Sequence, residues 1–219
     1  MKITTLNFEN NPNIGLFAVA TDGFCLTGKF IRDKDAELMA SILKVPVHRM
    51  SVLRTGFLGV FCAGNSRGVV VSDKLHDDEI AELQKKVEVL VLDSKQTAMG
   101  NILLANDRGC IISKELEPHR DQISKFLDVE TRVGTIDGLD LVGSLAVANS
   151  NGCLVHKAIT EKEKALVEKT LGVSLMQSSV NFGNQWIRSG LVANSNGFVA
   201  GDQTSGPELG LISETLGFL

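Results

Sequence analysis

The sequence predicts an α/β fold in which five ββαβ repeats form one closed, five-fold pseudosymmetric ring over residues 1–219. A polar turn ending in glycine recurs five times, as ATDG, NSRG, NDRG, NSNG and NSNG, at intervals of 41 to 45 residues. Each turn lies between two short apolar runs, and a segment with helical spacing follows it. A repeat of this length is a supersecondary unit that buries its apolar face only against its neighbours. We therefore expect a single domain of internal repeats.

The two apolar runs of each repeat predict a β-hairpin. In the second repeat the runs are Val60–Ala63 and Val69–Val71, and the turn Asn65–Gly68 joins them. β-branched residues favour strands, while glycine takes a positive φ in a tight turn at little cost and asparagine tolerates it. We therefore expect the repeated turn residues to be structural, because asparagine side chains bond the local backbone and tolerate left-handed geometry.

A helix is expected after each hairpin, because the apolar spacing changes from two residues to between three and four. Residues 80–87 and 209–216 have apolar side chains at i, i+3 and i+7. Capping boxes at Thr160–Glu163 and Ser205–Glu208 mark helix starts, and Pro118 suits a first helical position. Each repeat therefore continues from its hairpin into a helix.

A last strand completes each repeat except the fifth. Residues 87–91 and 129–136 predict such strands, but the chain stops at residues 217–219, directly after the fifth helix. Lys2–Leu6 reads as a strand that belongs to no hairpin, so we expect it to complete the fifth repeat and close the ring. The alternative at this period is a β-propeller with four strands per blade. The helical segment in every repeat and the single tryptophan count against it.

Composition predicts a cytoplasmic protein without a membrane segment. The start of the chain lacks a basic segment followed by an apolar one, and no apolar run approaches the roughly 18 residues of a spanning helix. The formal net charge of −4 argues against broad binding to nucleic-acid phosphates, although it leaves room for a local basic patch.

No catalytic or metal site is predicted, and no cofactor is expected. The cysteines lie inside apolar strands without C-x-x-C spacing, which is typical of reduced core thiols. His48, His76 and His119 are isolated in sequence, and His156 falls at a strand end where other repeats have serine. The cysteines are Cys25, Cys62, Cys110 and Cys153.

The candidate binding residues lie in the segments that lead into each hairpin, at the opposite end from the repeated turn. In a ring these lead-in segments gather on one face, which we call the lead-in face. Glycine, small polar groups and a few apolar residues there suit close approach to a large flat partner, and they equally suit ordinary turns. The candidates are Asn10, Asn13, Gly15, Gly56, Gly59, Gly100, Asn101, Gly143, Ser144, Gly183 and Asn184.

Several short motifs together resemble the archaeal translation initiation factor 6 family, the ribosome anti-association factors. Individually weak, they occur in a specific order along the whole chain. They are Phe8–Asn11 with Ile14–Gly15, Gly64–Asn65 with Gly68, Met99–Asn101, Leu141–Ser144, Gly152 with Leu154–His156, and Glu208–Leu209 with the ending Phe218–Leu219.

The resemblance implies the pentein fold, an α/β-propeller-like ring, in a monomer that is not an enzyme. It further implies binding to the large ribosomal subunit, at ribosomal RNA near the sarcin–ricin loop and an adjoining ribosomal protein. Bound there, family members block joining of the small subunit, and they take part in late subunit maturation. Their contact face maps to the lead-in segments, with Asn101 and Gly15 as the most specific matches.

Two other functions remain open at this point. Guanidine-modifying enzymes share the pentein fold and use an exposed cysteine nucleophile near the C-terminus, with histidine and acidic partners. The last cysteine here, Cys153, directly follows a turn glycine in a core strand position, which disfavours that chemistry. The other alternative is a protein-binding scaffold without affinity for ribosomes.

Overall fold

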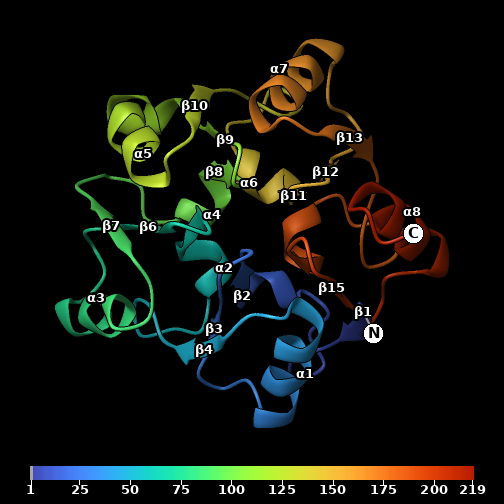
Figure 1. Ribbon diagram of the computed structural model, residues 1–219, viewed down its shortest axis with the longest axis horizontal. Coiled ribbons are helices and arrows are strands. Elements are labelled where there is room, and N and C mark those ends of the chain that lie inside the picture. Colours follow the sequence, from blue (N-terminus) through green and yellow to red (C-terminus); the bar gives the residue numbers. More distant parts are fainter. Residues whose placement is uncertain (1) are drawn as a thin grey trace.

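The computed structural model describes residues 2–219, and over that range the strands form five three-stranded sheets. Each sheet combines an antiparallel hairpin with a third strand that runs parallel to the second hairpin strand. The five units follow one another around a central axis, with short helical turns near the axis and longer helices at the periphery (Figure 1). The four-stranded blades of a β-propeller do not occur within this range.

Every unit has the same order: a short helical turn, two hairpin strands, an outer helix and a third strand. The first unit contains η1 (Ile14–Leu16), β2 (Ala18–Ala20), β3 (Cys25–Gly28), α1 (Asp33–Leu43) and β4 (Val47–Met50). The second contains α2 (Leu58–Phe61), β5 (Ala63–Asn65), β6 (Gly68–Ser72), α3 (Asp77–Gln84) and β7 (Val89–Leu92). The third contains α4 (Met99–Ile102), β8 (Leu103–Ala105), β9 (Gly109–Ile112), η2 (Lys114–His119), α5 (Arg120–Leu127) and β10 (Glu130–Val133). The fourth contains α6 (Val142–Leu145), β11 (Ala146–Ala148), β12 (Gly152–Val155), α7 (Glu161–Leu171) and β13 (Ser174–Gln177). The fifth contains η3 (Ile187–Gly190), β14 (Leu191–Ala193), β15 (Phe198–Gly201), α8 (Gly206–Thr215) and β1 (Ile3–Leu6).

The third strand of the fifth sheet comes from the other end of the chain. β1 pairs in parallel with β15, with Ile3 opposite Phe198 and Leu6 opposite Gly201. β4 lies beside β3 in the same way in the first unit. Both chain ends therefore lie in one unit, as the N and C labels of Figure 1 show.

The hydrophobic core is divided into five clusters, and each one is shared between two successive units. The first unit's core includes Val192 and Val199 from the fifth, and the fourth unit's core includes Leu104 and Ile111 from the third. The other three clusters follow the same rule. No unit buries its apolar face alone, which is the physical reason for repeating it.

Close approach and not positive φ accounts for four of the five turn glycines, so the predicted reason for them was wrong. Their φ values are not positive; the glycines with positive φ are at other positions. Instead, a Cβ at Gly109 would overlap the carbonyl oxygen of Thr170, at the end of the next unit's helix. A Cβ at Gly152 would likewise overlap the carbonyl oxygen of Thr215. A Cβ at Gly197 would lie 2.6 Å from the carbonyl oxygen of Ile42 in the first unit, and one at Gly68 would lie 2.4 Å from that of Glu88 in its own unit. At Gly23 the nearest atom is 3.3 Å away, so four of the five turn glycines lie where a side chain would overlap backbone.

The turn asparagines bond the local backbone, as predicted, and none of them has the positive φ of left-handed geometry. The Asn106 side-chain oxygen accepts hydrogen bonds from the N–H groups of Arg108 and Gly109, both at 2.9 Å. Its Nδ2 also donates to the carbonyl oxygens of Asn149 and Leu171 in the next unit, both at 3.0 Å. The sequence pattern did not predict this link between units.

The same link joins four of the five successive pairs of units. Asn65 donates into the third unit, Asn149 into the fifth, and Asn194 into the first, where it reaches the carbonyl oxygens of Thr21 and Leu43. Thr21 takes the asparagine position in the first unit, and its hydroxyl bonds only within its own turn: it accepts the N–H groups of Gly23 and Phe24 and donates to the carbonyl oxygen of Phe24.

Several predicted boundaries change in the structure. The capping boxes at the starts of α7 and α8 are confirmed. Pro118, however, lies inside η2, and α5 begins at Arg120. The strands β7 and β10 are shorter or shifted relative to residues 87–91 and 129–136. Val60 belongs to α2 instead of a hairpin strand, because a short apolar run does not distinguish a helical turn from a strand.

Candidate functional site

The lead-in face is built around the five short helical turns, which surround the axis in Figure 1. η1 contacts α2, α2 contacts α4, α4 contacts α6, α6 contacts η3, and η3 contacts η1. Each turn begins with a fully buried apolar side chain that fixes it on the core. These anchors are Ile14, Leu58, Met99, Val142 and Ile187.

The position after each anchor is glycine in four turns and arginine in the fifth. A Cβ at Gly59 would overlap the carbonyl oxygen of Gly15, and one at Gly100 would overlap that of Gly59. Gly143 stands in the same relation to Gly100, and Gly15 to Arg188. Because these turns touch through their backbones, the predicted candidates Gly15, Gly59, Gly100 and Gly143 are buried and have a packing role in the face.

The third position of each turn faces a depression of about 450 Å³ on the axis. These residues are Leu16, Val60, Asn101, Ser144 and Ser189. Arg188 and Trp186 also line the depression, together with the predicted candidates Asn13 and Asn184. The structure therefore brings Asn13, Gly15, Gly59, Asn101, Ser144 and Asn184 to one place.

The remaining candidates lie away from the depression. Asn10 and Gly183 are exposed in outer turns with positive φ, and Gly56 packs against the ring of Phe30.

Asn184, which lines the depression, also holds η3 in position, because its side-chain oxygen accepts the N–H of Trp186 at 3.0 Å and its Nδ2 donates to Ser189 Oγ at 3.1 Å.

Arg188 is the residue of this site that sequence reasoning missed. Its Nε donates to the carbonyl oxygen of Gly59 at 3.0 Å, and its Nη2 donates to that of Cys62 at 3.3 Å. Burial lowers the pKa of this guanidinium to about 10, so it remains charged at neutral pH. The signal was present in the repeats, because the position after the apolar anchor reads Gly, Gly, Gly, Gly and Arg.

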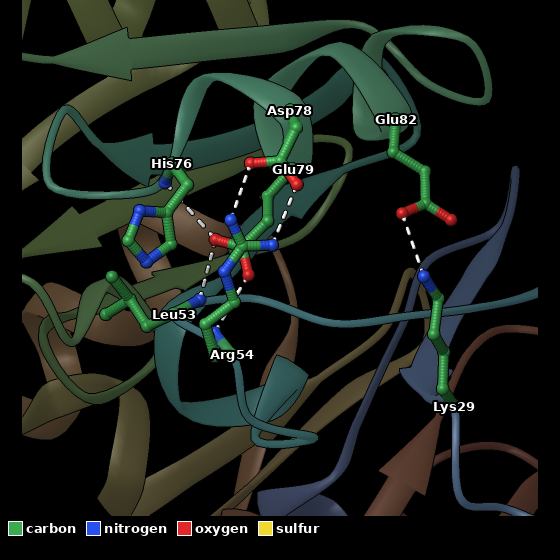
Figure 2. A network of polar contacts seen from close by, with 7 residues as sticks. All are labelled: Lys29, Leu53, Arg54, His76, Asp78, Glu79 and Glu82. Atoms are coloured by element: carbon green, nitrogen blue, oxygen red, sulfur yellow. Dashed lines mark hydrogen bonds and ion pairs between the residues drawn. The ribbon is translucent and has the colours of Figure 1, made fainter.

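The outer turns of the face are held by buried carboxylates at the starts of the outer helices. Leu53 and Arg54 both have positive φ, and their N–H groups donate to Glu79 at 2.9 and 2.8 Å. The N–H of His76 donates to the same carboxylate at 3.2 Å, and Arg54 pairs with Asp78 (Figure 2). One glutamate thus caps its helix and fixes a lead-in turn, which preorganises the face.

Glu163 and Glu208 repeat this arrangement in the fourth and fifth units. Glu208 accepts the N–H groups of Phe182 and Gly183 at 3.1 and 2.9 Å, besides those of its own capping box. Burial raises the pKa of each carboxyl, but the hydrogen bonds from hydroxyl and N–H groups outweigh it and bring both pKa values to about 2. Both groups are therefore ionised at neutral pH.

Exposed aromatic side chains lie on or against the lead-in segments, and Trp186 among them lines the depression; sequence reasoning missed these too. Phe182 is 85% exposed and Trp186 is 45% exposed, both on the segment leading into η3. Phe57 stacks on Phe17 with ring centroids 5.0 Å apart, and Phe30 meets Phe17 edge-on. Exposed aromatic and arginine side chains are enriched where proteins bind large partners.

The cysteines are buried free thiols, as predicted, and none of them lies exposed on a surface. Burial raises the pKa of each thiol to about 12, so the nucleophilic thiolate is scarce at neutral pH. Cys25, Cys110 and Cys153 lie in β3, β9 and β12 as core residues, whereas Cys62 lies between α2 and β5 and not in the strand expected for it.

Comparison with known proteins shows the family of this chain. The model of the eIF-6 family matches residues 3–215. The chain belongs to the eIF-6 family. It is 35% identical to translation initiation factor 6 of Pyrococcus horikoshii over 100% of both chains, and 34% identical to that of Methanosarcina mazei over 99% of both. The resemblance drawn from the short motifs is confirmed.

A third relative, translation initiation factor 6 of Methanococcus vannielii, is 36% identical over 95% of this chain and 96% of its own. Family membership thus covers the whole of the five-unit fold. Within residues 2–219, the structure has no helix with the length and apolar character needed to span a bilayer.

Proposed function

We propose that this protein binds the large ribosomal subunit through its lead-in face and prevents association with the small subunit. In this proposal it acts in translation initiation and in late maturation of the large subunit. Membership of the eIF-6 family supports a role in translation initiation. The observation that carries the proposal is the lead-in face itself, where Asn101, Ser144 and Arg188 offer donors in a depression that the exposed Trp186 also lines.

The physical argument is one of rigidity and bulk. A specific interface buries about 800 Å² on each partner, which is below a tenth of the 9187 Å² surface of this protein. The buried apolar anchors and the glutamate-held turns fix the face before contact, so little conformational entropy is lost on binding. A rigid body anchored on the joining surface of one particle then excludes the other by its volume.

The partner surface in this proposal is a ribosomal protein with adjoining ribosomal RNA near the sarcin–ricin loop. The net charge of −4 disfavours a contact made through RNA phosphates alone. The exposed Trp186 and Phe182 on the segment leading into η3 suit a protein surface, since aromatic side chains are enriched among the residues that dominate such contacts.

We further infer a single domain over residues 1–219 whose five units close one ring, the pentein fold, in a cytoplasmic monomer. Support comes from the cores, since the cluster of the first unit takes Val192 and Val199 from the fifth. The pairing of β1 with β15 and the contact of η3 with η1 support closure as well.

A non-catalytic role is part of the proposal. The alternative of a guanidine-modifying enzyme requires an exposed cysteine nucleophile, and the burial of all four thiols disfavours it. The other alternative is a protein-binding scaffold without ribosome affinity. Sedimentation with ribosomal subunits distinguishes it from the proposal, because such a scaffold would not comigrate with the large subunit.

The test is sucrose-gradient sedimentation of the protein with purified large and small subunits. The expected result is comigration with the large subunit only, together with fewer joined ribosomes when both subunits are present. Failure to comigrate with the large subunit, with the protein folded, would reject the proposal.

A further inference from the structure

Arg188 breaks the five-fold pattern at the centre of the lead-in face. The other four turns place glycine after the buried anchor, and each glycine is packed against a neighbouring carbonyl. Only the fifth turn carries a side chain there, and this side chain extends to the carbonyl oxygens of Gly59 and Cys62 across the axis. A long cation on the axis is therefore a specific feature and not a consequence of the repeat.

The guanidinium has no counter-charge within residues 2–219. It forms no ion pair there, and no aspartate or glutamate lines the depression. Its two hydrogen bonds to carbonyl oxygens leave donors free, because a guanidinium has five N–H groups. A partly buried cation without an acidic partner attracts an anion more strongly than an exposed one does.

The rest of the depression is neutral and offers further polar groups. Asn101, Ser144 and Ser189 lie on three of the short turns, while Leu16, Val60 and Leu141 add apolar surface. The volume of about 450 Å³ falls in the range of small-ligand sites, which is roughly 300 to 1,000 Å³.

We propose that the axial depression binds a single carboxylate group, with Arg188 as its counter-charge and Asn101 and Ser144 as additional donors. One positive charge balances one carboxylate, whereas a phosphate dianion would remain only half neutralised. The apolar walls fit a short aliphatic stem behind the carboxylate. The group belongs either to a small free carboxylic acid or to an acidic side chain or chain end of a protein partner. The second source rests on the proposed function.

Trp186 provides the measurement, because it lines the depression and is the single tryptophan of the chain. Tryptophan fluorescence is followed while the free protein is titrated with butyrate at constant ionic strength, with chloride, butylamine and inorganic phosphate as separate probes. The expected result is a saturable change with butyrate in the millimolar range. A linear response, an equal response to butylamine, or tighter saturation with phosphate would overturn the assignment.

Variants locate the site. Arg188→Met should abolish the saturable response, and a thermal melt establishes that the variant is folded. Asn101→Asp keeps the Arg188 hydrogen bonds and introduces a competing carboxylate, so it should weaken butyrate binding at least about tenfold. Arg67→Gln, which removes a cation paired with Asp128 at the opposite end of a hairpin, is the matched control and should leave the titration unchanged. If Arg188→Met and Asn101→Asp both bind butyrate normally, the proposal is wrong.

Sedimentation with large subunits then identifies the source of the carboxylate. Competition by butyrate for subunit binding assigns the group to a ribosomal partner, and saturation of the depression without loss of subunit binding assigns it to a free acid. Should the protein fail to bind subunits at all, the proposed function fails while the fluorescence titration still decides this inference.

Discussion

Replacing Asn106 by alanine tests the links that join successive units. The asparagine is buried, and its side chain accepts two N–H groups of its own turn and donates to two carbonyl oxygens of the fourth unit. Alanine removes all of these bonds and leaves buried polar groups without partners. With a net contribution of about 0.5 to 1.5 kcal/mol for each of these four hydrogen bonds, the loss is about 2 to 6 kcal/mol. That is a large share of the 5 to 15 kcal/mol typical of a folded domain.

The assay is urea unfolding followed by circular dichroism and by tryptophan fluorescence, with the free energy taken from the linear extrapolation. Asn151→Ala is the matched control, because this exposed asparagine lies in the next turn and donates from its side chain to one carbonyl oxygen, that of Leu216 at 3.1 Å. It should cost about 1 kcal/mol or less. A loss below about 1 kcal/mol for Asn106→Ala would refute the reasoning, since the links would then contribute little to holding the units together.

Three further predictions concern the frame of the face. Deleting residues up to Leu6 removes the third strand of the fifth sheet, so the melting temperature should fall by several degrees or more; an unchanged midpoint would contradict the closure of that unit. The carboxyls of Glu163 and Glu208 have pKa values of about 2 against an ordinary 4.5, so their stabilisation is complete above pH 4.5 and is lost as pH falls towards 2. Glu208→Gln should accordingly flatten the fall of urea stability between these pH values, and an unaltered slope would argue against it. Changing each cysteine singly to alanine should lower the melting temperature through a cavity while leaving large-subunit binding intact wherever the variant is folded; loss of binding in a folded variant would favour the enzyme alternative.

The sequence predicts the repeat and its hairpins because these depend on local patterns. Capping boxes such as Thr160–Glu163 follow from local hydrogen bonding, and they are found in the structure. Val60 and Phe61 were misassigned to a strand because a short apolar run fits a strand and a buried helical turn equally well. The helical turns that build the centre of the lead-in face were therefore missed as a class.

Other features depend on contacts between units, which one repeat does not contain. Gly109 looks like an ordinary turn glycine until Thr170 is brought against it. Asn106 is likewise bonded to residues of the next unit. Asn101 and Ser144 were predicted at the face, whereas Arg188 was not, because a repeat pattern identifies the positions that the units share and Arg188 is where the fifth unit differs.

The central claim, that the lead-in face is the contact with the large subunit, is tested most directly by pelleting two charge variants with large subunits. Asn101→Glu places a carboxylate in the face beside the expected partner, and the loss of its amide leaves partner groups unpaired, at a cost of about 1 to 3 kcal/mol. Binding should weaken roughly ten- to a hundredfold, since about 1.4 kcal/mol corresponds to tenfold. Arg67→Glu makes a larger charge change at the opposite end of a hairpin and should matter much less. If Arg67→Glu abolishes binding while Asn101→Glu binds normally, the contact lies at the other end of the molecule.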